Sequence, residues 1–298
     1  MKGRLYLVPV PIGSGLPDVE LSAGVLAVIR SVRDFVVENE RTARRLLSRT
    51  LDAEAMAAVS LAELNEHTPP EDLEPLLEPL LAGRDCAILS EAGSPCIADP
   101  GAGLVQLAHR ADITVCPLPG PVSLMLALMA SGLGGQHFSF AGYLPVEESA
   151  RRQALQDMEK HSAQTGCTWL FIETPYRNDA MIRTALASLR NGTQFCVAAG
   201  LQSAEQRIVS QSIARWQRQP YLPGKVPAVF VLSAGDGSTA GPDKAAGGGS
   251  FRPTDRPSSA PGSQRPSRPV RPDSQAKRPA PRGQHPPKRP AKPKKRGS

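Results

Sequence analysis

The chain has 298 residues, with 35 Lys and Arg against 28 Asp and Glu, and its net charge is +7. This length suits about two domains of ~100–200 residues each. The charge is uneven, because residues 236–298 hold fifteen Lys and Arg and four Asp; they carry +11 and leave −4 for residues 1–235. The basic pI therefore belongs to the C-terminal segment and says little about the part of the chain that folds.

Residues 236–298 have the composition of a disordered tail. They contain no Leu or Ile, one aromatic residue (Phe251), and prolines throughout. Such a segment cannot bury enough apolar surface to offset the entropy lost on ordering. We therefore expect a disordered Pro/Lys/Arg-rich tail.

The cysteines and the N-terminus indicate a cytosolic protein without a zinc site. No CxxC pair and no His at metal-ligand spacing accompanies the five cysteines, so a structural zinc is disfavoured. The apolar run in MKGRLYLVPVPIG is too short for a signal peptide, and no run is long enough to span a bilayer. The five histidines lie far apart, so hydrolase chemistry has no support either.

In the first half of the chain, short apolar runs alternate with segments of helical spacing. The predicted strands are residues 5–10, 34–37, 59–61, 86–89 and 113–117. The predicted helices are residues 21–32, with Ser22 as N-cap, and 42–49, 69–81 and 104–110. This alternation predicts an α/β fold with a mostly parallel sheet covered on both faces.

The alternation resumes after PLPGP at residues 117–121. The predicted helices are residues 123–131, 150–161 and 178–189, and the predicted strands are 138–143, 168–173, 195–199, 205–211 and 228–232. We therefore expect an N-terminal α/β domain at 1–117, a C-terminal α/β domain at 118–235, and the tail at 236–298.

Three loops rich in small residues each follow a predicted strand: VPIGSG (10–15), SEAGSPCIADPG (90–101) and PLPGPVS (117–123). Such loops at the carboxyl ends of strands are typical of nucleotide or sulfonium-cofactor sites in open α/β sheets. None is a GxGxxG fingerprint and none precedes GK[ST], which disfavours a classical dinucleotide or ATP site. One Gly-Pro loop alone is often just a turn, but three after strands favour a binding site.

Charged residues follow two of the strands. Glu38 and Glu40 come after the strand at 34–37; they either form a polar wall for a ligand hydroxyl or are acids favoured by a helix dipole. Arg44 and Arg45 either contact an anionic substrate or lie on a solvated helix face. In FIETPYRN (171–178), Glu173, Tyr176 and Arg177 cluster at a strand end, where a Glu173–Arg177 pair could be catalytic or structural.

Five segments together resemble one known family: LVPVPIG, ENERTARRLL, ILSEAGSPCIADPGAGLV, PLPGPVSLMLALMASGL and FIETPYRN. Their order and spacing are similar to the tetrapyrrole methylase superfamily of S-adenosylmethionine-dependent methyltransferases, and within it to the small-subunit ribosomal RNA 2′-O-ribose (cytidine) methyltransferase branch. The resemblance runs from about residue 5 to residue 232. It implies two α/β domains with the cofactor in the cleft between them, commonly in a homodimer.

By motif position, the resemblance also implies the residues that bind S-adenosylmethionine. They are Pro11, Gly13, Ala92, Gly93, Ile97, Ala98, Asp99, Ser123, Tyr176, Ala199 and Pro227. The chain departs from the family where PIGN reads PIGS, SDAG reads SEAG and GPSA reads GPVS. With the short chain after FIETPYRN, these departures suggest a sister group and leave the target nucleotide open.

Methylation of a ribose hydroxyl requires in-line positioning and a proton acceptor. The candidate acceptors are Glu40, Glu91 and Glu173, and the candidate substrate-binding residues are Arg41, Arg44 and Arg177. The +11 tail would contact phosphates of ribosomal RNA or of the small ribosomal subunit. Two alternatives stay open. One is a methyltransferase of a small molecule such as a tetrapyrrole, which the −4 charge of residues 1–235 favours. The other is an inert RNA-binding or assembly factor.

Overall fold

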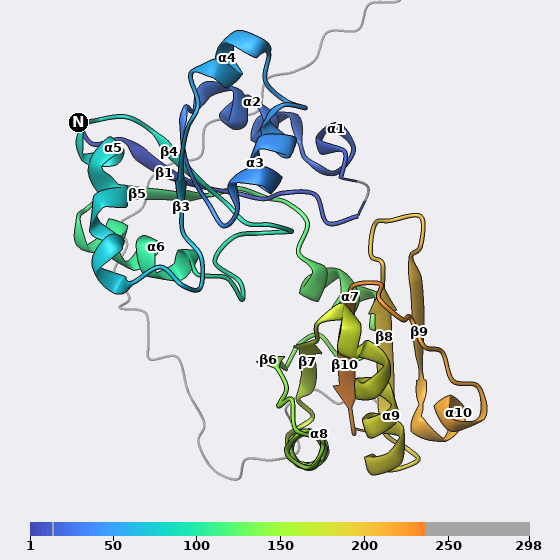
Figure 1. Ribbon diagram of the computed structural model, residues 1–298. Helices are drawn as coiled ribbons and strands as arrows, with labels where there is room; N and C mark the ends of the chain where they lie inside the picture. Colours follow the sequence, from blue (N-terminus) through green and yellow to red (C-terminus); the bar gives the residue numbers. More distant parts are fainter. Residues whose placement is uncertain (14, 236–298) are drawn as a thin grey trace, which may run out of the picture. The chain divides into compact units, whose positions relative to one another are not determined.

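The computed structural model describes residues 1–13 and 15–235, and its first sheet is entirely parallel (Figure 1). Its strands lie in the order β3-β2-β4-β1-β5, so β1 and β4 pair at the centre. The strands are β1 (Arg4–Val8), β2 (Asp34–Val37), β3 (Ser60–Glu63), β4 (Cys86–Leu89) and β5 (Thr114–Pro117). The carboxyl ends of all five meet at one edge, so all three small-residue loops, which follow β1, β4 and β5, start at this edge.

Helices cover both faces of the first sheet, as the alternation predicts (Figure 1). On one face, Ile29 of α2 (Ala23–Ser31) and Leu47 of α3 (Glu40–Leu47) pack with Phe35 and Leu89. On the other face, α5 (Glu78–Leu81) and α6 (Gly101–Arg110) pack against β1 and β4 through a second apolar cluster. The remaining short helices of this half are α1 (Pro17–Glu20) and α4 (Ala53–Ala57). Every strand side chain of β4 is buried, as its uninterrupted apolar run requires.

The second sheet is mixed, which corrects the expectation of a mostly parallel arrangement for this half. Its order is β6-β7-β10-β8-β9, and β6 with β7 is its parallel pair. The pairs β7–β10, β10–β8 and β8–β9 are antiparallel. A short turn without a helix joins β8 to β9, as an antiparallel pair of consecutive strands allows. The strands are β6 (Phe138–Tyr143), β7 (Thr168–Ile172), β8 (Gln194–Ala199), β9 (Arg207–Ser212) and β10 (Ala228–Ser233).

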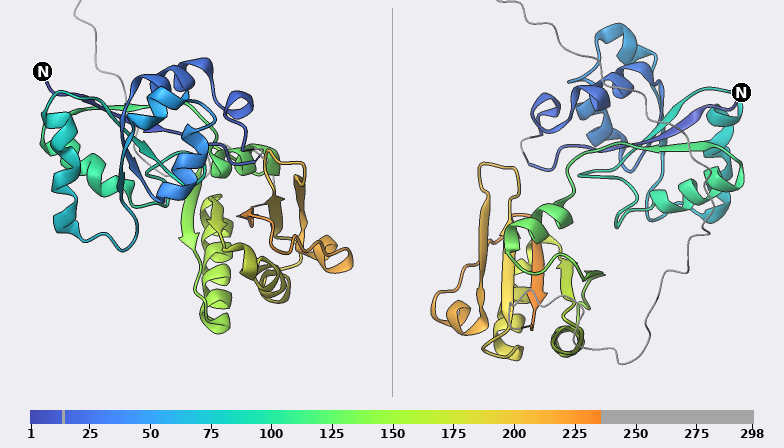
Figure 2. Two further views of the ribbon diagram at one scale, coloured as in Figure 1. Left: turned by 45° about the horizontal axis from the view of Figure 1, so that its top comes forward. Right: turned by 180° about the vertical axis from the view of Figure 1, so that it is seen from behind.

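The second sheet, drawn from two further directions in Figure 2, also has an apolar cluster on each face. One cluster joins α7 (Ser123–Ser131) to β8 and β10 through Leu124 and Leu128. The other joins α8 (Glu148–Thr165), α9 (Asn178–Ser188) and α10 (Ile213–Arg218) to the strands around the stacked rings of Phe171 and Phe230. The rings are 5.3 Å apart between centroids and almost parallel, at 14°.

Some sequence expectations are confirmed and one helix is wrong. Ser22 caps α2, where its hydroxyl accepts from the Val25 N–H. The helix predicted at 69–81 is instead three short pieces, η1 (Pro70–Asp72), η2 (Glu74–Leu77) and α5. Pro70, Pro75 and Pro79 account for this, because each lacks an N–H and begins a new turn.

No helix among the described residues is long and apolar enough to cross a membrane. The expected disordered tail at 236–298 lies outside the described residues. The division into domains at 1–117 and 118–235 remains a prediction. The presence of two separate sheets is consistent with it.

Candidate functional site

The loops after β1 and β4 are joined by backbone hydrogen bonds at the carboxyl edge of the first sheet. The Val10 N–H donates to the Gly93 carbonyl at 2.8 Å, and the Gly93 N–H donates back to Val10 at 3.1 Å. The Ser90 hydroxyl donates to the same Gly93 carbonyl at 3.0 Å. Gly93 has φ +79°, and a Cβ there would lie 3.4 Å from a methyl group of Ile12. Glycine is therefore needed both for the backbone conformation and for the close approach of the two loops.

A carboxylate that the sequence analysis missed shapes the loop after β1. Glu20 accepts hydrogen bonds from the backbone N–H groups of Ile12 at 2.7 Å, Gly13 at 3.2 Å and Gly15 at 3.2 Å. Hydrogen bonds to an ionised acceptor are stronger than neutral ones, so this carboxylate holds the loop in shape. Acids in the first turn of a short helix are common. The sequence contains no pattern that predicts contact between the loop after β1 and the Glu20 carboxylate.

The loop after β4 is held by its own acid. Both carboxylate oxygens of Asp99 accept from the Cys96 N–H at 2.8 Å, and one also accepts from the Gly101 N–H at 2.9 Å. The structure thus gives Asp99, a predicted cofactor-binding residue, bonds within the loop itself. Cys96 and Ala98 have φ of +67° and +61°, a left-handed conformation that costs free energy for any residue with a Cβ.

The result of this strained turn is an apolar surface at the sheet edge. Between the two left-handed residues, Ile97 is 44% exposed, and Ala98 is exposed beside it. Burial, and then the charge of Asp99, raises the pKa of the Cys96 thiol to about 11. The thiol therefore stays protonated at neutral pH and is no nucleophile. Among the described residues, no group of His, Cys, Asp and Glu could hold a metal ion.

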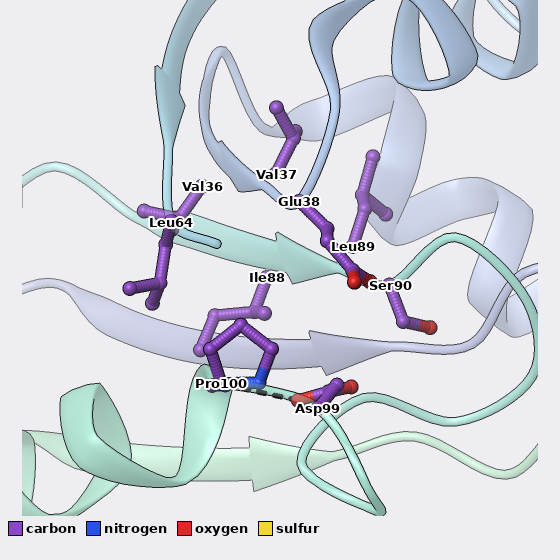
Figure 3. A pocket seen from close by; sticks show the side chains of 10 residues that line it. Val36, Val37, Glu38, Leu64, Ile88, Leu89, Ser90, Asp99 and Pro100 are labelled. Atoms are coloured by element: carbon purple, nitrogen blue, oxygen red, sulfur yellow. Dashed lines mark hydrogen bonds between the residues drawn. The ribbon is translucent and has the colours of Figure 1, made fainter. Parts of the chain in front are cut away.

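The loop after β2 brings Glu38 against the loop after β4. Its carboxylate accepts from the Glu91 N–H at 3.4 Å, and Figure 3 shows it pointing toward Ser90, with Asp99 across the small pocket. This pocket has a cavity volume of about 10 Å³, roughly the minimum for one water. Burial, followed by the negative charge of Glu91, raises the pKa of the Glu38 carboxyl above its ordinary value of 4.5.

The other predicted residues of this edge lie on α3. Asn39 caps the helix by accepting from the N–H groups of Arg41 and Thr42. Glu40 pairs with Arg44 one turn later at 3.2 Å, with both side chains about half exposed. This is an ordinary helix-surface ion pair, and Arg41 is exposed beside it. Glu40, one of the three proton-acceptor candidates from the sequence, is thus paired with a cation, whereas the negative charge of Glu91 acts on Glu38.

In the second half, Glu173 and Arg177 form an ion pair just after β7, in which the carboxylate is buried and the guanidinium is partly exposed. The Arg177 guanidinium lies 2.8 Å from a Glu173 oxygen whose side chain is 0% exposed. The other Glu173 oxygen accepts from the Thr174 N–H at 2.8 Å, and Arg177 also donates to the Pro145 carbonyl at 3.2 Å. Arg177 balances the charge of the buried carboxylate, which gives the pair the character of a structural element, although the Glu173 oxygen nearest to Arg177 accepts no hydrogen bond from the described residues.

The predicted cofactor residues of the second half gather at one edge of the second sheet. Ala199, at the end of β8, pairs with Ala228 at the start of β10, and the Gly200 N–H donates to the Pro227 carbonyl at 2.9 Å. Ala199 is fully buried, so a ligand at this edge would meet it only through the residues that cover it. Tyr176 is 79% exposed, with the Lys225 ammonium 5.1 Å from its ring centre. Ser123 is the first residue of α7.

The chain matches one protein family and several named relatives. The family model described as Tetrapyrrole (Corrin/Porphyrin) Methylases matches residues 4–216. A Vibrio cholerae protein named "Ribosomal RNA small subunit methyltransferase I" is 34% identical over 210 residues, which cover 70% of this chain and 69% of the relative. A protein of the same name from Xylella fastidiosa is 34% identical over 218 residues, covering 73% and 75%.

Other relatives match over a smaller share of their length. The protein of that name from Escherichia coli O157:H7 is 36% identical over 177 residues, 59% of this chain and 57% of the relative. Among solved structures, a hypothetical protein from Aeropyrum pernix K1 aligns at a TM-score of 0.54 and 16% identity, over 78% of this chain and 85% of that one. The methyltransferase CobJ aligns at 0.52 and 17% identity, over 78% and 94%. At these identities the structures indicate a shared fold.

Proposed function

We propose, from the premise that this chain belongs to the tetrapyrrole methylase family, that it methylates a ribose 2′-hydroxyl of small-subunit ribosomal RNA with S-adenosylmethionine as methyl donor. The observation that carries the proposal is the 34% identity with the Vibrio cholerae relative, whose name specifies the RNA of the small ribosomal subunit. Several relatives are matched over little more than half of their length. The substrate of this chain is therefore proposed here and does not follow from their names alone.

The carboxyl edge of the first sheet fits S-adenosylmethionine. The apolar surface of Ile97 and Ala98 suits an adenine ring, and the glycine-containing loop at Gly13 allows close backbone approach. The other residues proposed to hold the cofactor are Pro11, Ala92, Gly93, Asp99, Ser123, Tyr176, Ala199 and Pro227. When bound, S-adenosylmethionine supplies an electrophilic methyl group on a sulfonium. The protein's part is to hold this group in line with the ribose oxygen and to exclude water.

Glu38 is the carboxylate best suited to accept the proton of the ribose hydroxyl. A general base works best when its pKa approaches the working pH, and partial burial beside Glu91 moves Glu38 in that direction. Glu91 lies on the facing loop and can hold the same hydroxyl in place. Glu40 is neutralised by Arg44, and Glu173 by Arg177, so both rank below Glu38.

Basic groups support an RNA substrate. Arg41 is exposed at the start of α3 near this edge, and the tail at 236–298 carries +11. Lys and Arg contacts to phosphates give affinity without sequence preference, which suits a tether to ribosomal RNA. A cytosolic location agrees with this substrate and with the five cysteines, all of which are free thiols.

We also propose a homodimer. The edge strand β6 exposes Phe138, Phe140 and Tyr143, and Met129 of α7 is 78% exposed. Aromatic residues on an open strand edge are typical of an interface. Sedimentation analysis should find a dimer that Phe140→Asp converts to monomer, while Val19→Asp, at an exposed position of α1, leaves it intact. A monomeric wild type would contradict this proposal.

The methylation pattern of ribosomal RNA tests the proposed function. In a strain of the source organism that lacks the gene, one 2′-O-methylated ribose of the small-subunit RNA should disappear, and the wild-type gene should restore it. An unchanged pattern in the deletion strain would contradict the proposal. If a base methylation disappeared instead, ribosomal RNA would remain the substrate, but the ribose hydroxyl would not be the methylated group.

A further inference from the structure

A second cavity opens between α3 and the loops after β1 and β4, and its volume is about 180 Å³. Thr42, Arg45 and Arg49 form one wall, and Pro11, Ser90 and Glu91 belong to the loops that face them. Positions 42, 45 and 49 recur at helical spacing, so α3 and the turn after it present one face to the cavity. The cavity thus adjoins the loops of the proposed methyl-donor site and has its own cationic wall.

The size of this cavity matches a fragment of a large ligand. A pocket that encloses a whole cofactor-sized ligand has about 300–1,000 Å³. One sugar-phosphate unit of a chain that continues into solvent is therefore a better match than a complete nucleotide cofactor.

The charges of the cavity favour a phosphodiester. Arg45 makes no ion pair among the described residues, whereas its neighbour Arg44 is paired with Glu40. Arg49 donates to the carbonyl of Gly15, a bond that orients the guanidinium and leaves its charge available. Glu91 is the carboxylate on the opposite wall, so two cations and one anion surround the space. A guanidinium fits phosphate oxygens, and a carboxylate or hydroxyl fits ribose hydroxyls.

We propose that this cavity binds one ribose-phosphate unit of the RNA substrate, with Arg45 and Arg49 on the phosphate and Ser90 and Glu91 toward the sugar. The inference rests on the proposed function, because it takes RNA as the substrate. It assigns Arg45 a role in substrate binding that is separate from methyl-donor binding. Arg45 is a substrate-positioning residue. Arg44 and the exposed face of α3 contribute less to binding of the RNA.

The test compares Arg45→Gln with Arg110→Gln in the full-length protein. Arg110 is an exposed arginine in the last turn of α6 and gives a control with the same change of charge. With small ribosomal subunits from the deletion strain as substrate, Arg45→Gln should raise KM about 10–100-fold, the range for loss of a charge-assisted hydrogen bond. The slope of log affinity against log salt should become shallower by about 0.7. Arg110→Gln should change neither quantity.

Two further measurements separate a binding role from a structural one. Calorimetry with S-adenosylmethionine should give the wild-type affinity for Arg45→Gln, and Arg45→Lys should restore part of the RNA affinity. Inorganic phosphate at millimolar concentration should weaken RNA binding by the wild type more than by Arg45→Gln. If Arg45→Gln and Arg110→Gln have equal KM and salt dependence while the wild type methylates the subunits, the inference is wrong. If the wild type itself fails to bind or methylate them, the proposed function fails first.

Discussion

The backbone N–H of Glu91 lies 3.4 Å from the side-chain carboxylate of Glu38, and this contact ties the loop after β4 to the loop after β2. The loop after β4 is also tied to the loop after β1 through Val10 and Gly93. Three loops that are far apart in sequence are thereby fixed at one edge of a parallel sheet. Such rigid support is what in-line methyl transfer demands, because small errors in position are costly to the rate.

Replacement of Glu38 by Gln should lower kcat about 10²–10⁴-fold with little change in S-adenosylmethionine affinity, because a proton acceptor is lost and the shape is kept. In the wild type, activity should fall as the pH drops through the pKa of Glu38, which burial raises above 4.5. The acidic limb of the pH–rate profile should therefore lie above the ordinary Glu range. A Glu40→Gln variant is the matched control. Equal losses in both variants would remove Glu38 from the role.

The same substitution should stabilise the fold at neutral pH. Because the pKa of Glu38 is higher in the folded state, its stabilising effect is present below the unfolded pKa and is lost as the pH rises through the folded pKa. Thermal unfolding should therefore give Glu38→Gln a higher Tm than wild type at pH 7, and a smaller advantage at pH 4. A lower Tm at pH 7 would indicate that the carboxylate is held by favourable contacts.

Glu20→Gln should disorganise the loop after β1. The carboxylate accepts from three backbone N–H groups, and hydrogen bonds to a charged acceptor contribute about 1.5–3 kcal/mol. Denaturant unfolding should show a loss of this order, and calorimetry should show weaker S-adenosylmethionine binding. Asp18→Asn, at an exposed site in the same helix, should change neither. Wild-type affinity in Glu20→Gln would mean that this loop does not touch the cofactor.

Gly93→Ala should reduce both stability and cofactor binding, whereas Gly166→Ala should reduce stability alone. Both glycines have positive φ, at +79° and +71°, so Ala costs about 1–2 kcal/mol at either position. A Cβ on Gly93 additionally meets Ile12 at 3.4 Å, while nothing lies within 4 Å of one on Gly166. Comparing unfolding free energies with S-adenosylmethionine affinities separates these effects. Equal affinities in the two variants would place the cofactor elsewhere.

The Glu173–Arg177 pair should behave as a structural element. Arg177→Met leaves a carboxylate whose side chain is 0% exposed without its cation, which costs about 3–5 kcal/mol. Glu173→Gln combined with Arg177→Met should recover most of that stability. The double variant should also retain a kcat near that of the wild type. A folded double variant without activity would restore Glu173 to the list of catalytic candidates.

Removal of residues 236–298 should weaken binding to small ribosomal subunits and flatten its salt dependence, because the segment carries +11. The kcat at saturating substrate should change little, since the proposed chemistry lies in residues 1–235. Filter binding across a salt series measures the effect, and a variant with the same segment shuffled serves as control. An unaltered salt slope after truncation would reject the tether.

The sequence was most informative where local pattern and structure agree. Bounds of β4, α7 and β6 match the predicted ranges, because short apolar runs and an apolar helix have clear limits there. The segment 69–81 failed because three prolines outweighed its helical periodicity. The antiparallel half of the second sheet was missed, although the lack of a helix between β8 and β9 was a usable signal.

The site was predictable as loops and much less so as side chains. Small residues after strands predict the loops at Gly13 and Gly93, because tight backbone conformations favour glycine and other small residues. The role of Glu20 depends on a loop that folds back over it, which no local pattern reveals. The Arg44–Glu40 ion pair was predictable, because Glu40 lies four residues before Arg44.

Whether the purified protein transfers a methyl group to a ribose of ribosomal RNA can be measured with a radioactive donor. Small ribosomal subunits from the deletion strain would be incubated with S-adenosylmethionine labelled in the methyl group, and the RNA would be hydrolysed with alkali. A 2′-O-methylated ribose blocks cleavage at its own phosphodiester, so the account predicts label in an alkali-resistant dinucleotide, and much less with Glu38→Gln. Absence of label from the RNA, with protein that binds S-adenosylmethionine, would contradict the account.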